Sequence, residues 1–452
     1  MTEGLRIYSK GGHKLPQEKY DVAIIGSGIG GMCAAALLAH HGYKVLVVEK
    51  LPQLGGRCSS IEYKGFKIPH VAQEQPINGV TASIFKEVGA EFELAAQPPI
   101  VYRIKGKDYE LPRKGGLAFL LSQICKDEAE LNRIGTALRR ARTWEVASDC
   151  ISFRDWLLQF TDNELVLGLF QNVFCVLLMT VLHEVSAKDV IGYYNRGMRQ
   201  WSDAARPLRG NLALMQSLAK VIQGRGGDIW LRCEARQILT ADGVVKGIVV
   251  NKDGDEIEIT AKAVISNAGP KETMSLVGEE KLDRGYVTEL RENIHHGSQM
   301  LITLGSDRPL ITYPGGLGLL GARRVVTIST LTLTCPELSP PGKYMLAAQC
   351  MPKSEIGPLN RQKEIEAAME DLRENVPGFD QYAEVLDISC FFNPDWPGYR
   401  NLAGYYPPQK TPIENLYNVG DGVAPFGECG TPGSALTARI VTEDLKNRIK
   451  PG

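Results

Sequence analysis

The feature that most constrains this sequence is a glycine-rich turn at residues 26–31, GSGIGG, which lies between an apolar run and a helical segment. Residues 20–25, YDVAII, are almost continuously apolar, as in a strand of a parallel sheet whose two faces are both covered. Residues 32–42 form a predicted helix that ends at Gly42, a residue suited to the left-handed position that follows a helix. Residues 43–49, YKVLVVE, have the pattern of a second buried strand, so the segment predicts a βαβ unit.

The spacing of the glycines in this turn is the one that a dinucleotide diphosphate requires. Gly26 allows a tight turn off the strand, Gly28 lets the backbone approach a pyrophosphate, and Gly31 lets the helix pack closely on the sheet. Gly30 belongs to the same turn, and the helix that starts there offers unpaired N–H groups and a partial positive charge to phosphate. Glu49 stands 18 positions beyond Gly31, where a carboxylate that binds ribose hydroxyls is expected. These residues predict dinucleotide binding and disfavour a 2′-phosphate, but they do not separate NAD from FAD.

A second loop follows Glu49 at a short interval and makes that distinction. The glycines at 55 and 56 let the backbone lie against a flat cofactor, and the guanidinium of Arg57 can meet phosphate. The sequence VVEKLPQLGGRCSS resembles the signature of the flavin-containing amine oxidase and phytoene desaturase superfamily. The resemblance implies FAD as the cofactor, with Glu49 at the adenosine ribose and Gly55, Gly56 and Arg57 at the diphosphate–flavin side.

Two later segments extend the resemblance. The sequence LYNVGDG resembles the second FAD motif of the superfamily, which places Asp421, after Gly420, at the ribityl–diphosphate region. The sequence TPGSA, which includes Gly433, begins a last helix whose N-terminal dipole would point at the flavin. The middle segment is also similar to the family's, and it implies that Ala235 lends its backbone to the adenine and that Asn267 ends a strand beside the cofactor.

These segments together predict an α/β fold: a Rossmann-type FAD-binding domain with a parallel sheet and an antiparallel meander, plus an interleaved α+β substrate domain. In the meander, Asp253-Gly254 separates two alternating segments and predicts a hairpin turn. The expected boundaries are a polar lead-in at 1–19, an FAD-binding domain at 20–75, 211–270 and 411–452, and a substrate-binding domain at 76–210 and 271–410.

Composition narrows the class of protein. The chain has 452 residues with a net charge of −1 and no long run of either sign, which argues against a nucleic-acid partner. Its most apolar window, residues 165–182, is broken by two polar residues, and we interpret it as a buried helix rather than a membrane span. The first residues lack the apolar core of a signal peptide. We expect a cytoplasmic protein and leave peripheral membrane contact open.

Further details favour the phytoene desaturase and retinol saturase branch. The Gly420-Asp421 pair resembles that branch, whereas amine oxidases usually carry a glutamate at the second position. Residues 65–71, GFKIPHV, depart from the branch, which usually has an aspartate–glycine pair after its GF. The surroundings of the isoalloxazine therefore differ, and we expect a small hydrophobic substrate, isoprenoid-like or alicyclic, that is smaller or more polar than a C40 polyene.

Three residues are catalytic candidates, each set against an ordinary structural role. Glu428 precedes the last helix and is a candidate acid or base, or else a loop carboxylate bonded to backbone. His295 and His296 begin an alternating segment expected to enter the substrate-domain sheet, so one of them, His296 in our assignment, faces the cavity. Tyr405, with Tyr406, resembles the aromatic pair that sandwiches an amine over flavin, or else packs in the core. No spacing indicates a metal site.

The leading hypothesis is an FAD-dependent desaturase or saturase that makes or removes a C=C bond by hydride transfer to or from flavin N5. The alternatives are an amine or porphyrinogen-type oxidase, an isomerase that needs reduced flavin, and a lipid-chain escort protein without flavin chemistry. The electron partner is left open among oxygen, a quinone and a nicotinamide.

Overall fold

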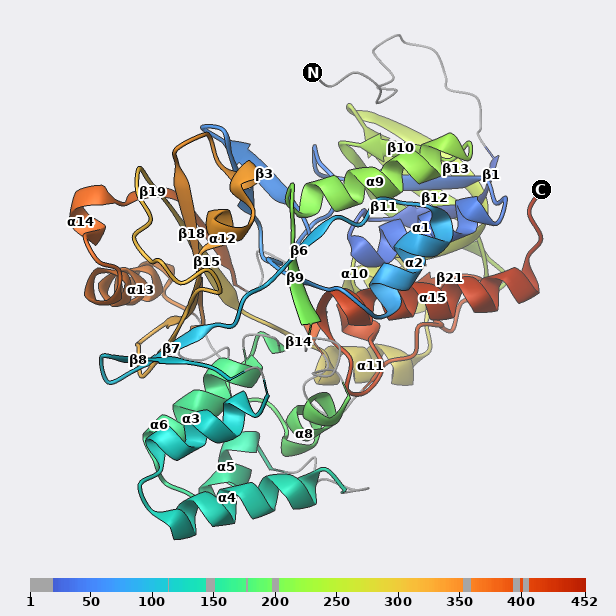
Figure 1. Cartoon of the computed structure of the whole chain (residues 1–452). Helices are drawn as coiled ribbons and strands as arrows, with labels where there is room; N and C mark the ends of the chain where they lie inside the picture. The colour runs from blue at the N-terminus through green and yellow to red at the C-terminus, as the bar shows by residue number, and fades with distance from the viewer. Residues whose placement is uncertain are drawn as a thin grey trace.

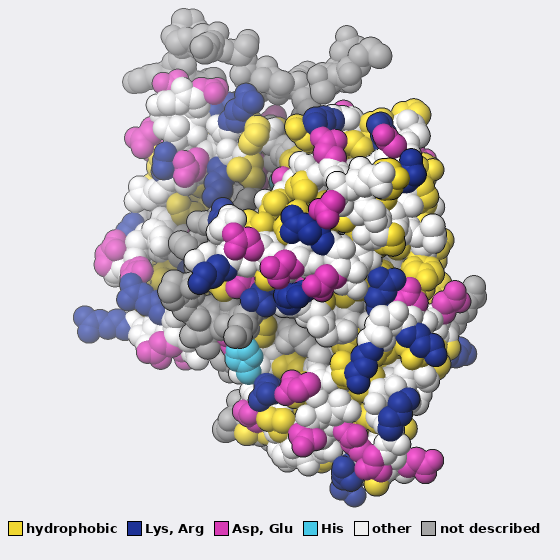
Figure 2. All heavy atoms as spheres, turned by 90° about the vertical axis from the view of Figure 1, so that its left-hand side faces the viewer, with side chains coloured by type: hydrophobic (Ala, Val, Ile, Leu, Met, Phe, Trp, Pro, Cys, Tyr) yellow, Lys and Arg dark blue, Asp and Glu magenta, His cyan; other side chains and the backbone are white. Residues whose placement is uncertain are grey.

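The computed structural model describes residues 19–112, 114–143, 151–175, 178–196, 203–352, 359–392, 399–400 and 406–452. It has three parts: a sheet layered with helices around the predicted βαβ unit, a second sheet beside it, and a cluster of helices below the second sheet (Figure 1). On the face drawn in Figure 2, acidic and basic side chains are interspersed among apolar ones.

The first sheet contains the predicted βαβ unit. Strands β1 (Lys19–Ile25) and β2 (Val45–Glu49) pair in parallel, and α1 (Ile29–His40) connects them. The chain leaves α1 through Gly42, whose φ is +85°, as the sequence predicts. The other strands of this sheet are β10 (Asp228–Leu231), β11 (Cys233–Ala241), β12 (Val244–Lys252), β13 (Asp255–Ser266) and β21 (Leu416–Asn418). The strand order is β10-β2-β1-β13-β12-β11, with β21 also paired to β13. The predicted α/β class, with a parallel sheet and an antiparallel meander, is confirmed.

Strand β13 serves two sheet regions at once. Its first half pairs antiparallel with β12 across the turn at Asp253 and Gly254, whose φ values are +54° and +97°. Its second half pairs parallel with β1 and with β21. The strand runs through 12 residues without a break. The meander is therefore joined rigidly to the sheet whose strand ends form the site.

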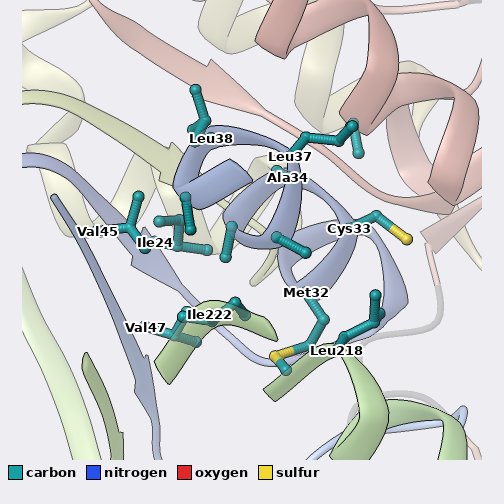
Figure 3. Close-up of a cluster of buried hydrophobic side chains, with 14 of the residues drawn as sticks. Ile24, Met32, Cys33, Ala34, Leu37, Leu38, Val45, Val47, Leu218 and Ile222 are labelled. Atoms are coloured by element: carbon teal, nitrogen blue, oxygen red, sulfur yellow. The ribbon is translucent and has the colours of Figure 1, made fainter. Parts of the chain in front are cut away.

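The core on one face of this sheet brings the two ends of the chain together. Helix α1 packs between α9 (Asn211–Gly224) and α15 (Gly430–Arg448), and α2 (Val80–Val88) lies next to them. Figure 3 shows side chains from β1, β2, α1 and α9 that interlock here: Ile24, Met32, Cys33, Ala34, Leu37, Leu38, Val45, Val47, Leu218 and Ile222. The small residues on α1 allow the close approach of α15. Residues near 420–434 consequently lie beside the first glycine-rich turn.

The second sheet has seven strands in the order β19-β15-β18-β17-β16-β7-β8. These are β7 (Val101–Ile104), β8 (Lys107–Glu110), β15 (Gln299–Ser306), β16 (Leu317–Leu320), β17 (Val325–Ser329), β18 (Tyr344–Cys350) and β19 (Glu384–Phe391). Helix α13 (Arg361–Asn375) covers one face, and α12 (Leu331–Thr334) and α14 (Phe379–Tyr382) lie nearby. Short strands link the two large sheets: β3 (Ser60–Tyr63), β4 (Phe66–Pro69), β5 (Gln75–Pro76), β6 (Leu94–Ala96) and β9 (Ala204–Pro207). The predicted domain boundaries remain a prediction.

The helical cluster corrects one expectation. Its helices are α3 (Gly116–Ile124), α4 (Glu128–Ala141), α5 (Phe153–Leu158), α6 (Glu164–Phe170) and α8 (Ala187–Asn195). The prediction of one buried helix across 165–182 holds only in part, because α6 passes into a π-helical turn at Gln171–Cys175 and residues 179–182 are not helical. The Gln171 amide then bonds to the carbonyl of Thr180 and the N–H of Leu182, which folds the chain back. None of the helices in the described part of the chain combines the length and hydropathy needed to cross a bilayer.

A second correction concerns the two histidines. Residues His295–His296 form β14, which pairs only with β20 (Tyr399–Arg400) as a separate two-stranded ribbon after α11 (Arg284–Asn293). The substrate-side sheet starts three residues later, at Gln299. The segment that the histidines begin does enter that sheet, as β15, but the histidines themselves lie outside the sheet, in the ribbon.

Candidate active site

A cavity of about 840 Å³ lies between the first sheet and the second. Its walls are the ends of β1, β2 and β13, the first turns of α1 and α15, helix α10 (Pro270–Val277), and one face of β15 and β18. Ligands of open α/β sheets bind at the carboxyl ends of the strands, where these elements meet. Most residues predicted to bind the cofactor line this cavity: Gly26, Gly28, Gly30, Glu49, Gly55, Gly56, Arg57, Ala235, Asn267 and Asp421.

The first glycine turn has no room for side chains. A Cβ on Gly28 would lie 2.5 Å from Oδ1 of Asn267, and one on Gly30 would lie 3.1 Å from the backbone nitrogen of Gly420. A Cβ on Gly31 would lie 2.3 Å from the carbonyl oxygen of Gly26. Gly31 does not line the cavity, so its role is packing between helix and sheet, as its place in the motif implies.

Two helix N-termini open onto the cavity, and neither is capped by its own N-cap residue. The N-cap of α1 is Gly28, which has no side chain, and the side chain of Cys429, the N-cap of α15, makes no capping bond. One N–H of each first turn is bound by a side chain from elsewhere, that of Gly31 by Asn267 and that of Gly430 by Asp421. The cavity is lined by Ile29 and Gly30 of α1 and by residues 430, 431 and 434 of α15. The first turn of each helix carries a partial positive charge, so the two together favour an anion between them. A diphosphate fits this arrangement.

Glu49 is held in place by three donors. One of its oxygens accepts hydrogen bonds from the backbone N–H of Ser27 at 2.8 Å and from the Ser27 hydroxyl at 2.7 Å. The other accepts a bond from the N–H of Leu51 at 2.9 Å. The carboxylate is 6% exposed and lines the cavity, with lone pairs left to accept hydroxyl donors.

The second loop and the C-terminal motif meet across the cavity. Gly55 has a φ of +102°, and a Cβ there would lie 2.4 Å from the carbonyl oxygen of Cys58. A nitrogen of Arg57 lies 3.7 Å from a carboxylate oxygen of Asp421. The other oxygen of Asp421 accepts a bond from the N–H of Gly430, the first residue of α15, at 2.6 Å. Gly420, the residue before Asp421, has a φ of +116°.

Two further groups in the cavity have shifted pKa values. Burial raises the pKa of Cys58 to about 12, so its thiol is neutral at ordinary pH and is no nucleophile. Burial also lowers the pKa of Lys271, whose ammonium donates to the carbonyl of Arg291. Lys271 belongs to α10, which lines the end of the cavity near Ala235.

The sequence did not indicate several residues of the cavity. Helix α10 contributes Lys271, Glu272, Ser275 and Leu276, and it begins at Pro270, four residues after β13 ends at Ser266. That position was the available signal, because residues that follow a strand end lie at the edge where ligands bind. On the opposite side the cavity is lined by Val71, Gln73, Glu74, Met179, Gln299 and Gln349. Here the signal was a glutamine in each of two largely apolar strands, Gln299 at the start of β15 and Gln349 within β18.

The catalytic candidates are placed less favourably. Glu428 and Gly433 do not line the cavity; they pack against each other at the start of α15. The structure does not describe the side chain of His296, and Tyr405 lies outside the described residues. Tyr406, the second member of the predicted aromatic pair, donates its hydroxyl to Asp189 and packs edge-on against Phe426. It does not line the cavity either.

Comparison with known proteins places this geometry in a family. A family model described as flavin containing amine oxidoreductase matches residues 29–445, which include all of the residues that line the cavity except Ile25, Gly26 and Gly28. The chain belongs to this family. Members are flavin-dependent enzymes, and a flavin dinucleotide fits the two helix N-termini, the glycine turns and the ribose-side carboxylate of this cavity.

Individual relatives of this flavin oxidoreductase support the same conclusion. An uncharacterised protein of Methanocaldococcus jannaschii is 24% identical over 429 residues, covering 92% of this chain and 96% of the relative. A zeta-carotene-forming phytoene desaturase of Myxococcus xanthus is 25% identical over 509 aligned positions, covering 94% and 93%. The crystal structure of an oxidoreductase from Methanosarcina mazei superposes with a TM-score of 0.81 at 28% identity, covering 93% of this chain and 99% of that one.

Proposed function

We propose that this flavin oxidoreductase binds FAD and makes or removes a C=C bond in a small hydrophobic substrate by hydride transfer. One observation carries the proposal. The N-terminal glycine turn, the Gly55–Arg57 loop and the first turn of α15 are far apart in the sequence, yet they line one cavity that extends to the second sheet. Bound flavin supplies a hydride acceptor or donor there.

The chain's own groups have distinct tasks in this proposal. The N-terminus of α1 and the guanidinium of Arg57 bind the diphosphate, and Glu49 accepts hydrogen bonds from ribose hydroxyls. The backbone of Ala235 borders the adenine. Asp421 fixes the N-terminus of α15 through Gly430, so that the positive end of this helix stays directed at the cavity and favours negative charge there.

Several observations favour C–C chemistry. The phytoene desaturase of Myxococcus xanthus matches nearly the whole chain, and Gly420-Asp421 has the form seen in that branch. Tyr406 binds Asp189 rather than facing the cavity, so the aromatic pair expected for an amine site lacks one member there. An amine oxidase is the second candidate, because the family's own description is that of amine oxidoreductases.

The test begins with the purified protein. We expect a flavin absorbance spectrum, and chromatography of the released cofactor should identify FAD rather than FMN. The flavin is then reduced without oxygen and challenged with cyclic and isoprenoid enones or dienes, while the oxidised protein is challenged with amines. Reoxidation by alkenes supports the proposal. Rapid reduction by amines, with no response to alkenes, replaces it with the second candidate, and a colourless protein that refuses FAD overturns both.

A further inference from the structure

The end of the cavity that faces the second sheet is lined by two amide side chains, those of Gln73 and Gln299, with atoms that lack a partner among the described residues. Gln73 is 5% exposed, and in the described part of the chain neither its oxygen nor its nitrogen has a hydrogen-bond partner. Gln299 is 2% exposed, and its oxygen also lacks a partner. Buried amides are normally satisfied, because leaving one unpaired costs its full desolvation penalty. Two such amides in one cavity point to a ligand that completes them.

The amides are held in fixed positions. Asn211, 2% exposed, donates to the carbonyl of Ala72 at 2.6 Å and accepts from the amide of Gln75 at 3.0 Å, so it fixes the chain on both sides of Gln73. Gln299 is the first residue of β15, and it shares a face with Leu301, which is paired in register with Gln349 of β18. Gln349 also lines the cavity, and its oxygen accepts from the hydroxyl of Thr327 at 3.0 Å.

The charges around these amides cancel. Glu74 lies beside Gln73, and its carboxylate is 3.6 Å from the guanidinium of Arg206. Arg206 is fully buried and fixed by bonds to four oxygens, those of Pro314, Gly315, Thr330 and Thr334. The cationic residues among those that line the cavity are Lys50, which follows β2, Lys271 on α10, and Arg57. Of these, Arg57 comes near the amide end, 3.9 Å from the sulfur of Met179, and its guanidinium is 3.7 Å from the carboxylate of Asp421. A carboxylate ligand would therefore meet a guanidinium that is already paired, and an ammonium ligand would meet a carboxylate that is already neutralised.

We infer that the substrate carries a neutral oxygen function, a hydroxyl or carbonyl, that hydrogen-bonds to Gln73 and Gln299. The inference rests on the proposed function, because it takes the amide-lined end as the substrate end. It deepens that function by naming the substrate class: oxygenated, otherwise apolar molecules rather than pure hydrocarbons, acids or amines. The amides supply both donors and acceptors, as a hydroxyl requires, and a carbonyl is bound by their donors alone.

The test is a binding measurement that needs no turnover, so its result is independent of the redox experiments. Two matched series are titrated calorimetrically into the flavin-loaded protein. The first is limonene, perillyl alcohol, perillaldehyde, perillic acid and perillylamine, and the second is the corresponding farnesyl set. We expect the alcohol or aldehyde of at least one series to bind about tenfold tighter than its hydrocarbon, acid and amine. Equal or tighter binding of a hydrocarbon, acid or amine in both series, or no binding of any oxygenated probe, overturns the inference.

Substitutions of the two glutamines distinguish a role in substrate recognition from a role in the stability of the fold. Gln73→Leu and Gln299→Leu should each weaken the binding of the oxygenated probe about tenfold. The affinity for the hydrocarbon should stay unchanged or rise. Because the amides have no protein partner, neither variant should lower the melting temperature of the ligand-free protein. Gln381→Leu, at an exposed position on α14, is the matched control and should change no affinity. A fall of several degrees in melting temperature with the probe preference intact would assign the amides a structural role and reject the inference.

Discussion

Asn267 accepts a hydrogen bond from the backbone N–H of Gly31 at 2.9 Å through its side-chain oxygen. Its side-chain nitrogen donates to the carbonyl of Val419 at 3.0 Å. One amide at the end of β13 thus joins the first turn of α1 to the C-terminal motif, and its two ends cannot be exchanged, because one partner is a donor and the other an acceptor. The N-terminal and C-terminal walls of the cavity are held together by this side chain.

Asn267→Asp should weaken flavin binding with almost no change of shape. The substituted oxygen would face the carbonyl of Val419, and a negative charge would be added beside the expected diphosphate. We expect a loss of about 1–3 kcal/mol in flavin binding, which is about 5- to 150-fold in Kd, measured by titrating FAD into the stripped protein. Asn132→Asp, exposed on α4, controls for the added charge. Unchanged affinity in the Asn267 variant would show that this amide does not organise the site.

Gly28→Ala tests how closely the backbone must approach the cofactor. Gly28 has a φ of −59°, which any residue adopts, so backbone strain plays no part. The added Cβ would lie 2.5 Å from Oδ1 of Asn267 and must displace it. We expect the purified variant to retain less than about a tenth of the flavin, since an overpacked contact typically costs about 1–3 kcal/mol. Gly224→Ala, at the end of α9 with open space around it, should bind flavin normally. Full flavin content in both variants would contradict the predicted close approach.

Asp21 links strands of the first sheet. Its ionised carboxylate should stabilise the fold at neutral pH, and this contribution should be lost in acid. Burial alone would raise the pKa of Asp21, but hydrogen bonds from the Lys262 ammonium and the Lys44 N–H lower it below 3.8. Because folding lowers this pKa, the ionised carboxylate stabilises the fold at pH values above its unfolded-state pKa. That stabilisation is lost as the pH falls through the folded-state pKa. Asp21→Asn should therefore cost about 1 kcal/mol at pH 7, and less as the pH approaches 3.8 and drops below it.

Urea unfolding at a series of pH values measures this difference, with Asp162→Asn, exposed in the helical cluster, as the control. A stability gap between wild type and the Asp21 variant that stays constant down to acid pH would rule out the ionised carboxylate as its source.

The sequence predicted the dinucleotide side of the site well, because there the chemistry requires particular residues at fixed spacing. Gly28 and Gly30 admit no side chain, and Glu49 follows them at the spacing of a ribose carboxylate. The substrate side has no such rule. Gln73 and Gln299 reach the cavity only through the pairing of short strands and the register of β15, which depend on contacts between segments far apart in the chain.

The misplaced elements have the same origin. Residues 165–182 are apolar enough for one helix, yet the helix passes into a π-helical turn at Gln171–Cys175, and the Gln171 amide bonds to Thr180 and Leu182, which lie beyond the helical residues. Local propensity favours continuation of the helix, and the side-chain bonds, which no periodicity reveals, decide against it. The histidine ribbon likewise depends on pairing with residues 399–400, about 100 positions away.

Tyr406→Phe distinguishes a structural tyrosine from one that contacts substrate. The Tyr406 hydroxyl donates to Asp189, a carboxylate that is 5% exposed and also accepts from the Ser186 hydroxyl at 2.6 Å. Removing a hydrogen bond to a buried charged group should lower the free energy of unfolding by about 1.5–3 kcal/mol. Because Tyr406 does not line the cavity, kcat and KM for any accepted substrate should stay within about twofold of wild type, well under 1 kcal/mol. Tyr382→Phe, at a position 36% exposed, should change neither quantity. A large fall in kcat with unchanged stability would instead place Tyr406 at the reacting substrate and revive the amine-oxidase candidate.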